Sequence, residues 1–261
     1  QLIVKIIEMA TCKLCQEEKP LIKKSHIIPD FFYKESGLYN EKHQIHKIEA
    51  QEFAKSKKFG YVPTGDYEGG ILCKECDNEL IGRLETYGRK VLFGGLSKGE
   101  EIHCNNYHNP ADGFQYSICE NVDYTRFKLF LLSILWRACI TKRDVFKAAA
   151  IDECDLEKIR SMLINNDAGR LNEFPIIILS YLNDDTMPRD LIFQPIKSVT
   201  PEKTMITFLM GGYVFIFNIT DDYADIGDIE EVTITPANRV TIMHFLKGTA
   251  WDFILQYANL K

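Results

Sequence analysis

The chain has 261 residues, 46% of them hydrophobic and 26% charged, which is typical of a globular protein rather than of a disordered chain. No stretch reaches the ~18 uninterrupted apolar residues of a membrane span, and no secretory signal is visible. The net charge of −6 excludes a general polyanion-binding surface. Contact with nucleic acid would therefore depend on local basic clusters at residues 19–24 and 55–58, which are equally compatible with solvated faces.

In chain order, residues 9–100 contain every metal-type motif. The apolar pattern predicts a short strand at residues 22–28 and a second, weaker strand at residues 44–50. From Asp77 to residue 92 the apolar spacing becomes helical, and Asp77 is placed to cap that helix. This first region is expected to form one domain.

Residues 120–261 contain most of the apolar mass, and the polar residues 103–110 predict a loop before them. The strongest element is a helix at residues 124–140 with one wide apolar face. Gly211-Gly212 predicts the two-residue turn of a hairpin. Further helices are predicted at residues 144–150, 155–164 and 238–257, and strands at 174–182, 191–195, 205–210, 213–218 and 231–235. The order predicts an α+β fold, in which a second domain at 120–261 has helices, an antiparallel sheet and a C-terminal helix.

Four of the eight cysteines form two CxxC pairs, Cys12–Cys15 and Cys73–Cys76. Two such pairs supply the tetrahedral set of thiolates that structural zinc prefers. The 57 residues between Cys15 and Cys73 leave room for an inserted hairpin and loop, so the metal would clip the base of that unit. The alternatives are four unligated cysteines or a redox pair, although no thioredoxin-like βαβ pattern follows either motif.

The other four cysteines stand alone in the sequence. We expect them to be reduced, in a cytoplasmic protein, and to pack as small hydrophobes. They are Cys104, Cys119, Cys139 and Cys154. Likewise, His43, His46, His103 and His108 are expected to be surface residues, and His244 a structural residue of the last helix.

His26 is the candidate catalytic residue because it lies at a predicted strand end between the two knuckles. A lone histidine there is more often structural, but a neutral imidazole can also deprotonate water near neutral pH. Hydrolysis would need a divalent ion to stabilise the developing charge. Asp77 and Glu85 are the acids on the following helix, but about two turns separate them, so Asp77 is the better candidate ligand.

Taken together, these motifs resemble the zinc-ribbon subset of the HNH endonucleases, the His-Me finger or ββα-metal family. The resemblance rests on CxxC, then Ser25-His26-Ile27-Ile28-Pro29, then Gly69-Gly70, then the second CxxC at a helix start. The sequence Phe127-Lys128-Leu129-Phe130-Leu131 and its continuation to Arg137 resemble the helical region of the same group of bacterial proteins.

The resemblance implies a zinc-clipped ββα-metal unit in which the four cysteines hold structural zinc and His26 is the general base. It also implies a single catalytic ion, Mg²⁺, Mn²⁺ or another divalent ion, beside the histidine. This chain departs from the family at both ion positions, because Ser25 replaces the usual Asp and Asp77 the usual His or Asn. Glu68 lies nearest the expected place of the middle Asn. The ligand charge has moved from position 25 to position 77, or the ion site has been lost.

Two functions follow from these observations. The first is an HNH-like, metal-dependent endonuclease that hydrolyses phosphodiester bonds, with DNA as the expected partner, His26 as base, and Asp77, Glu85 and Ser25 as candidate ion ligands. The second is a non-catalytic, zinc-stabilised module that binds nucleic acid or protein, favoured by the missing Asp and the acidic second region. Residues 120–261 carry no catalytic motif, and we expect them to pack, to form a homo-oligomer or to recognise a protein partner.

Overall fold

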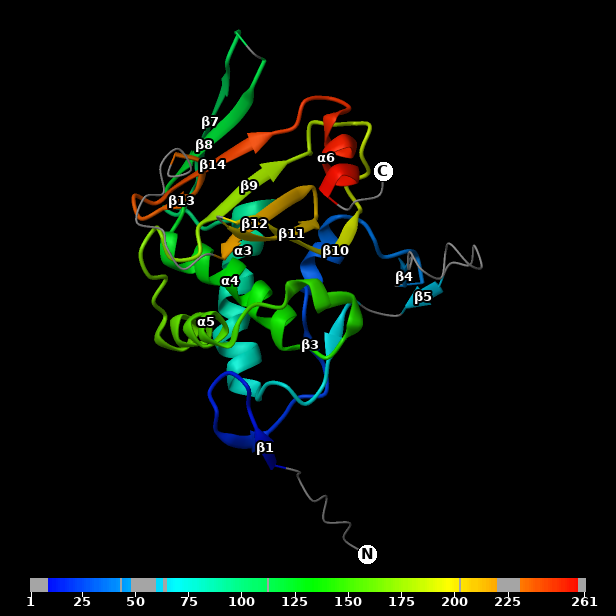
Figure 1. Ribbon diagram of the computed structural model, residues 1–261, viewed down its shortest axis with the longest axis vertical. Coiled ribbons are helices and arrows are strands. Elements are labelled where there is room, and N and C mark those ends of the chain that lie inside the picture. Colours follow the sequence, from blue (N-terminus) through cyan, green and yellow to red (C-terminus); the bar gives the residue numbers. More distant parts are fainter. Residues whose placement is uncertain are drawn as a thin grey trace, which may run out of the picture.

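The computed structural model describes residues 9–42, 44–47, 60–62, 65–111, 113–201, 203–219 and 231–257. Its largest feature is an eight-stranded sheet with the strand order β10-β11-β12-β9-β14-β8-β7 and with β13 beside β14 (Figure 1). Neighbouring strands are antiparallel, except that β14 runs parallel to β9. The strands are β7 (His103–His108), β8 (Gln115–Glu120), β9 (Ile176–Ser180), β10 (Ile192–Val199), β11 (Thr204–Met210), β12 (Tyr213–Ile219), β13 (Ile234–Thr235) and β14 (Arg239–His244).

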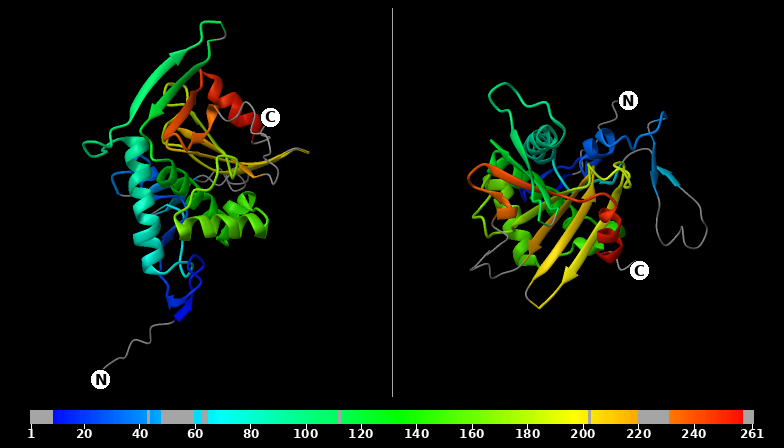
Figure 2. Two further views of the ribbon diagram at one scale, coloured as in Figure 1. Left: turned by 90° about the vertical axis from the view of Figure 1, so that its left-hand side faces the viewer. Right: turned by 90° about the horizontal axis from the view of Figure 1, so that it is seen from above.

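Helices cover both faces of this sheet (Figures 1 and 2). Alternate residues of β12 point to opposite faces, as the period of a strand requires. Phe215 and Phe217 join the larger core, which includes α4, whereas Val214 and Ile216 join a smaller core with Ala250 of α6. The longer helices are α3 (Gly82–Phe93), α4 (Tyr124–Ile140), α5 (Glu153–Asn165) and α6 (Thr249–Tyr257), and the shorter ones are α1 (Asp30–Glu35), the π-helix η1 (Glu75–Ile81) and the 3₁₀-helix η2 (Asp144–Ala149). The predicted mixture of helices with a largely antiparallel sheet is confirmed.

The hairpin of β11 and β12 confirms its sequence prediction. Thr204 pairs with Ile219 and Met210 with Tyr213, so the two strands are in register along their length. Gly211 and Gly212 have φ values of +63° and +88°, the left-handed values that a two-residue turn favours. A Cβ atom on Gly212 would lie 2.2 Å from a methyl carbon of Leu182, so a larger residue would also force the Leu182 side chain to move.

Helix α4 has the predicted bounds but is buried on nearly every side rather than on one wide face. The sheet, α3 and α5 surround it, so even Lys128 and Arg137 are only 2% and 1% exposed. The larger core contains residues from Cys12 to Val240 and is therefore continuous across the expected boundary between the two regions. The division into domains at 9–100 and 120–261 stays a prediction.

The loop predicted at residues 103–110 is wrong, because residues His103–His108 form the edge strand β7. All six residues of β7 are exposed, so the alternation of apolar and polar residues that marks a half-buried strand is absent from the sequence. Pairing with β8 supplies the order, and Cys104 pairs with Cys119. These two cysteines form a disulfide, which corrects the expectation that both would be reduced and separate. Figure 1 shows the hairpin of β7 and β8 projecting beyond the rest of the sheet.

The single helix predicted at residues 238–257 is also wrong. Residues Arg239–His244 form strand β14 between β8 and β9, and only residues Thr249–Tyr257 are helical. Gly248 between them has a φ of +83°, a left-handed value that neither a strand nor a right-handed helix can continue through. The strand forms because β14 can pair with β8 on one side and with β9 on the other. These long-range pairings cannot be predicted from the local periodicity of the sequence.

The N-terminal part contains three short two-stranded ladders. The strand predicted at residues 22–28 is reduced to β3, which pairs with β6, and the strand predicted at 44–50 is seen as β4 as far as the described residues extend. The ladders consist of β1 (Met9–Thr11) with β2 (Glu18–Pro20), β3 (Ser25–His26) with β6 (Tyr67–Glu68), and β4 (Ile45–Lys47) with β5 (Gly60–Val62). In the described part of the chain, no helix combines the length and apolar character that crossing a membrane requires.

Candidate metal centre and the adjacent histidine

The two CxxC pairs meet in space. The ligand atoms of Cys12, Cys15, Cys73 and Cys76 all lie within 4.8 Å of one another, and the sulfurs of Cys15 and Cys73 are 3.9 Å apart. Four sulfurs at about 2.3 Å from a tetrahedral zinc ion would be separated by roughly 3.8 Å. The cluster could therefore hold a metal ion such as zinc, as the sequence predicts.

Local backbone geometry sets each pair. The first forms a tight turn after β1, in which Gln16 N donates to Cys12 O at 2.8 Å and Gln16 has a φ of +63°. The second lies at the start of η1, where Asp77 N donates to Cys73 O at 3.0 Å. The backbone N–H of Cys73 also donates to Cys12 Sγ at 3.3 Å, so the turn and the helix start share a hydrogen bond.

The four thiols differ in their electrostatics. Burial raises the pKa of Cys73 to about 11 and also raises that of Cys76. Burial acts in the same direction on Cys12, but backbone N–H donors at residues 15, 73 and 14 outweigh it and lower the pKa of this thiol. Hydrogen bonds within the site thus favour the thiolate of Cys12, and a bound dication would provide the charge that Cys73 and Cys76 need to ionise.

Contacts with two helices fix the first CxxC turn. Lys13 Nζ donates to the carbonyl of Ile140 at the end of α4 at 2.8 Å, and Arg160 of α5 donates to the carbonyl of Leu14 at 2.7 Å. The backbone N–H of Lys13 donates to Ile71 O at 3.0 Å. The four-cysteine cluster is consequently packed against the helices that support the large sheet.

His26 lies at the end of β3, where it pairs with Tyr67 of β6. The loop after β6 returns close to the residues before β3, and a Cβ atom on Gly69 would lie 2.6 Å from the carbonyl oxygen of Lys23. Gly70 N donates to Ile22 O at 2.9 Å. The glycine pair noted in the sequence therefore allows the close backbone approach that brings β6 and the second CxxC pair beside β3.

Ser25 and Asp77 are brought into direct contact. The hydroxyl of the fully buried Ser25 donates to Oδ1 of Asp77. Asp77 was expected to cap its helix, but η1 begins at Glu75 and has no side-chain cap, so that expectation is wrong. Asp77 instead lies in the first turn with its carboxylate turned toward β3.

The imidazole of His26 is adjacent to a carboxylate that the sequence analysis did not select. His26 Nε2 lies 3.9 Å from Asp30 Oδ1, and the His26 side chain is 30% exposed. Burial acts to raise the pKa of Asp30, but hydrogen bonds from Lys34 at 2.5 Å and from the Tyr39 hydroxyl at 2.6 Å outweigh it and lower this pKa. Asp30 is thus held as a carboxylate beside the histidine. Its spacing of four residues from His26, at a helix start after Pro29, is the sequence signal that could have identified it.

Glu85 is engaged elsewhere. Its Oε1 lies 2.6 Å from Nη1 of the buried Arg137, as an ion pair without a hydrogen bond. Among the described residues, the four cysteines are the only group of three or more His, Cys, Asp or Glu ligand atoms gathered closely enough for a metal ion. The roles of Asp77, Glu85 and Ser25 as ligands of a second ion stay predictions.

The other histidines that the structure describes lie on strands. His46 is on β4, and His103 and His108 are on β7, where both are exposed. His244 lies on β14, not on the last helix as expected, and its Nε2 is 2.6 Å from the hydroxyl of Ser117. Burial lowers the pKa of His244. His43 lies outside the described residues.

Of the two basic clusters, the first borders the histidine. Lys24 Nζ lies 5.0 Å from the ring centroid of Tyr67, the pairing partner of His26. The second cluster, at residues 55–58, lies outside the described residues.

Compared with protein-family models, with curated proteins and with solved structures, the chain matches none.

Proposed function

We propose that this chain is an HNH-like endonuclease that hydrolyses phosphodiester bonds, with DNA as the expected substrate and His26 as the general base. One observation carries the proposal. Ser25, on the strand that carries His26, donates a hydrogen bond to Asp77, which lies in the first turn of the helix that follows the second CxxC pair. The β3–β6 ladder that carries His26 is thus in contact with the helix that follows the second CxxC pair. This contact supports the proposal, because the ββα-metal resemblance implies that a helix lies against the strand of the histidine.

The surroundings of His26 support a role as base. Its side chain is 30% exposed, so water can reach the imidazole, whereas its backbone lies in a ladder. The carboxylate of Asp30 at 3.9 Å would stabilise the imidazolium that forms when His26 accepts a proton from water. The cation of Lys24 over the Tyr67 ring adds positive charge on the same side for a phosphodiester.

A catalytic divalent ion is part of the proposal, and Asp77 is the residue that would hold it. Such an ion would offset the charge on the phosphate and on the leaving oxygen. One carboxylate is enough when phosphate oxygens and water fill the other positions, as is common for Mg²⁺. Ser25 would orient that carboxylate, and Glu85 contributes less because it lies against Arg137.

The test is nicking of supercoiled plasmid DNA with Mg²⁺ or Mn²⁺, with single-stranded DNA and RNA as parallel substrates. We expect His26→Ala to lower the rate by about 10²-fold or more, since general-base catalysis typically contributes that much. The exposed His103 on β7 provides the matched control, and His103→Ala should cleave like the unmodified chain. Equal rates for His26→Ala and the unmodified chain would remove His26 from the mechanism. If the unmodified chain cleaves none of the three substrates, the nuclease function is excluded.

The second candidate function is a zinc-stabilised module that binds nucleic acid or protein without turnover. The hydrogen bond from Ser25 to Asp77 favours this alternative. In the family an Asp at position 25 is a second ligand of the ion, whereas here the Ser25 hydroxyl donates to the Asp77 carboxylate instead. This alternative predicts that DNA binds with equal affinity in the presence and absence of Mg²⁺ and is never cut. Cleavage that depends on both His26 and a divalent ion would exclude it.

A further inference from the structure

Arg137 is a buried cation in the last turns of α4, and it contacts the strand that carries His26. It is 1% exposed, and its Nη1 donates to the backbone carbonyl of His26 at 2.6 Å. The same nitrogen lies 2.6 Å from Glu85 of α3. The Nε atom donates to Ser133 O at 3.1 Å, one turn earlier on α4. One guanidinium therefore links two helices to the backbone of the candidate base.

The ladder that carries His26 is too short to define its own position. β3 and β6 contribute two residue pairs, Ser25 with Glu68 and His26 with Tyr67. A two-stranded ladder is marginally stable even when it is much longer. The position of the His26 backbone must consequently depend on contacts from outside the ladder, and the bond from Arg137 is one of them.

The residues just after α4 hold the other strand. Arg143 donates to Tyr67 O at 3.1 Å and to Asp66 Oδ1 at 2.7 Å. Thr141 donates to the carboxylate of Glu68, which also accepts from the backbone N–H of Lys142 at 2.9 Å. The end of α4 and the three residues after it thus grip both strands of the ladder.

We propose that Arg137 is a positioning residue that sets His26 for reaction, and this inference rests on the proposed function. A buried ion pair such as Arg137 with Glu85 is weak evidence for stability, because desolvation offsets much of the attraction. Its geometric effect is specific, since a planar guanidinium fixes a carbonyl in a way that a flexible amine does not. Displacements of about 1 Å at a reacting group can cost ~10²-fold in rate.

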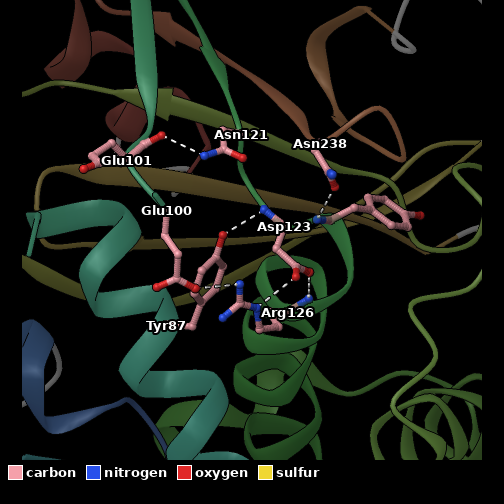
Figure 3. Close-up of polar contacts among 8 residues, drawn as sticks. Tyr87, Glu100, Glu101, Asn121, Asp123, Arg126 and Asn238 are labelled. Carbon is pink, nitrogen blue, oxygen red and sulfur yellow. Dashed lines mark hydrogen bonds and ion pairs between the residues drawn. The ribbon is translucent and has the colours of Figure 1, made fainter. Parts of the chain in front are cut away.

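The opposite end of the same helix provides a matched control. Arg126, in the first turn of α4, pairs with Asp123 at 2.9 Å and with Glu100 at 3.2 Å, and its guanidinium lies 4.0 Å from the ring centroid of Tyr87 (Figure 3). Tyr87 of α3 accepts from the backbone N–H of Asp123 at 2.7 Å. Arg126 therefore also links α4 to α3. Among the contacts described for it, none is with the β3–β6 ladder.

The experiment compares Arg137→Lys with Arg126→Lys, both of which keep the charge and remove the fork. NMR of histidine-labelled protein reports the His26 ring, assigned with His26→Gln, and plasmid nicking gives kcat and KM separately. We expect Arg137→Lys to shift the His26 resonances and to lower kcat by about 10²-fold with KM within about twofold, and Arg126→Lys to change neither. A folded Arg137→Lys protein with unshifted His26 resonances would overturn the proposal.

Two further measurements keep the outcomes distinct. If Arg137→Lys does not fold, Glu85→Gln removes the charged partner of Arg137 and should shift the same resonances by a smaller amount; unchanged resonances there would count equally against the proposal. If even the unmodified chain fails to cleave, the proposed function fails, while the resonances still show whether Arg137 positions the His26 ring.

Discussion

Lys128 of α4 places an amine inside the core. Its Nζ donates to the Tyr124 hydroxyl at 3.0 Å and to the carbonyl of Arg170 at 2.8 Å. Burial lowers the pKa of Lys128 from its ordinary 10.5 to about 7, and Lys158 adds to that effect, whereas Glu173 and Asp167 oppose it. At neutral pH the folded protein therefore holds a lysine close to its point of half-protonation.

This pKa makes stability depend on pH in a defined window. Above about pH 10.5 the amine is neutral in both states, and as the pH falls toward 7 the folded state increasingly resists a proton that the unfolded state binds. Stability contributed by the neutral amine is thus lost between about pH 10.5 and 7. We expect Lys128→Met to raise the unfolding free energy by roughly 1–3 kcal/mol at pH 7, after the lost hydrogen bonds are subtracted, with the gain fading toward pH 10.5.

Thermal melting from pH 6 to 10.5 measures this difference. Lys147 is exposed at 75% of its side chain, so Lys147→Met is the control and should differ from the unmodified chain by a pH-independent amount. A constant difference for Lys128→Met across the whole range would contradict the lowered pKa.

The β7–β8 hairpin is an element that contains a covalent link as well as strand pairing. Cys104 and Cys119 are joined across paired positions, 15 residues apart in sequence, and all of β7 is exposed. Closing a loop of this length lowers the conformational entropy of the unfolded chain, which raises the free energy of unfolding by about 3 kcal/mol in the chain-entropy description. We expect the double variant Cys104→Ser, Cys119→Ser to lose about 1–3 kcal/mol of unfolding free energy under non-reducing conditions.

Denaturant unfolding with and without reductant checks this expectation. Reductant should bring the unmodified chain down to the level of the double variant, and Cys154→Ser, which alters an exposed free thiol, should have no effect. Equal stability of the double variant and the unmodified chain in the absence of reductant would contradict a disulfide in this hairpin.

At the same scale, the sequence predicts the elements whose pattern is local. The hairpin at Gly211-Gly212 and the helix at 124–140 follow from turn chemistry and periodicity. Strands β7 and β14 could not be predicted, because one is wholly exposed and the other forms only when it lies between two distant strands. In the site, the four cysteines were predictable from spacing, and the spacing of four residues could have indicated the contact between His26 and Asp30. The bond from Arg137 to the His26 carbonyl, by contrast, depends on tertiary packing.

For the whole molecule, the continuous core ties the four-cysteine cluster to the large sheet. Cys12, Leu14 and Cys73 belong to the same buried cluster as α4 and β12. Loss of the metal should then destabilise more than residues 9–100. We expect Cys73→Ser to release zinc and to lower the melting temperature of a single cooperative transition.

Calorimetry together with elemental analysis tests this coupling, with Cys154→Ser as the control that keeps both zinc and melting temperature. Two separate transitions, of which only one moves, would instead show that residues 120–261 fold independently. Unchanged zinc content in Cys73→Ser would exclude this cysteine as a ligand.

We propose that a zinc-clipped unit sets His26 opposite an ion held by Asp77. Anomalous diffraction from crystals grown with Mn²⁺, measured at the zinc and manganese absorption edges, would locate both metals. We expect one zinc peak among Cys12, Cys15, Cys73 and Cys76 and one manganese peak at the Asp77 carboxylate next to His26. Zinc at the cysteines with no manganese at Asp77 would contradict the catalytic site, and no metal at the cysteines would contradict the clip itself.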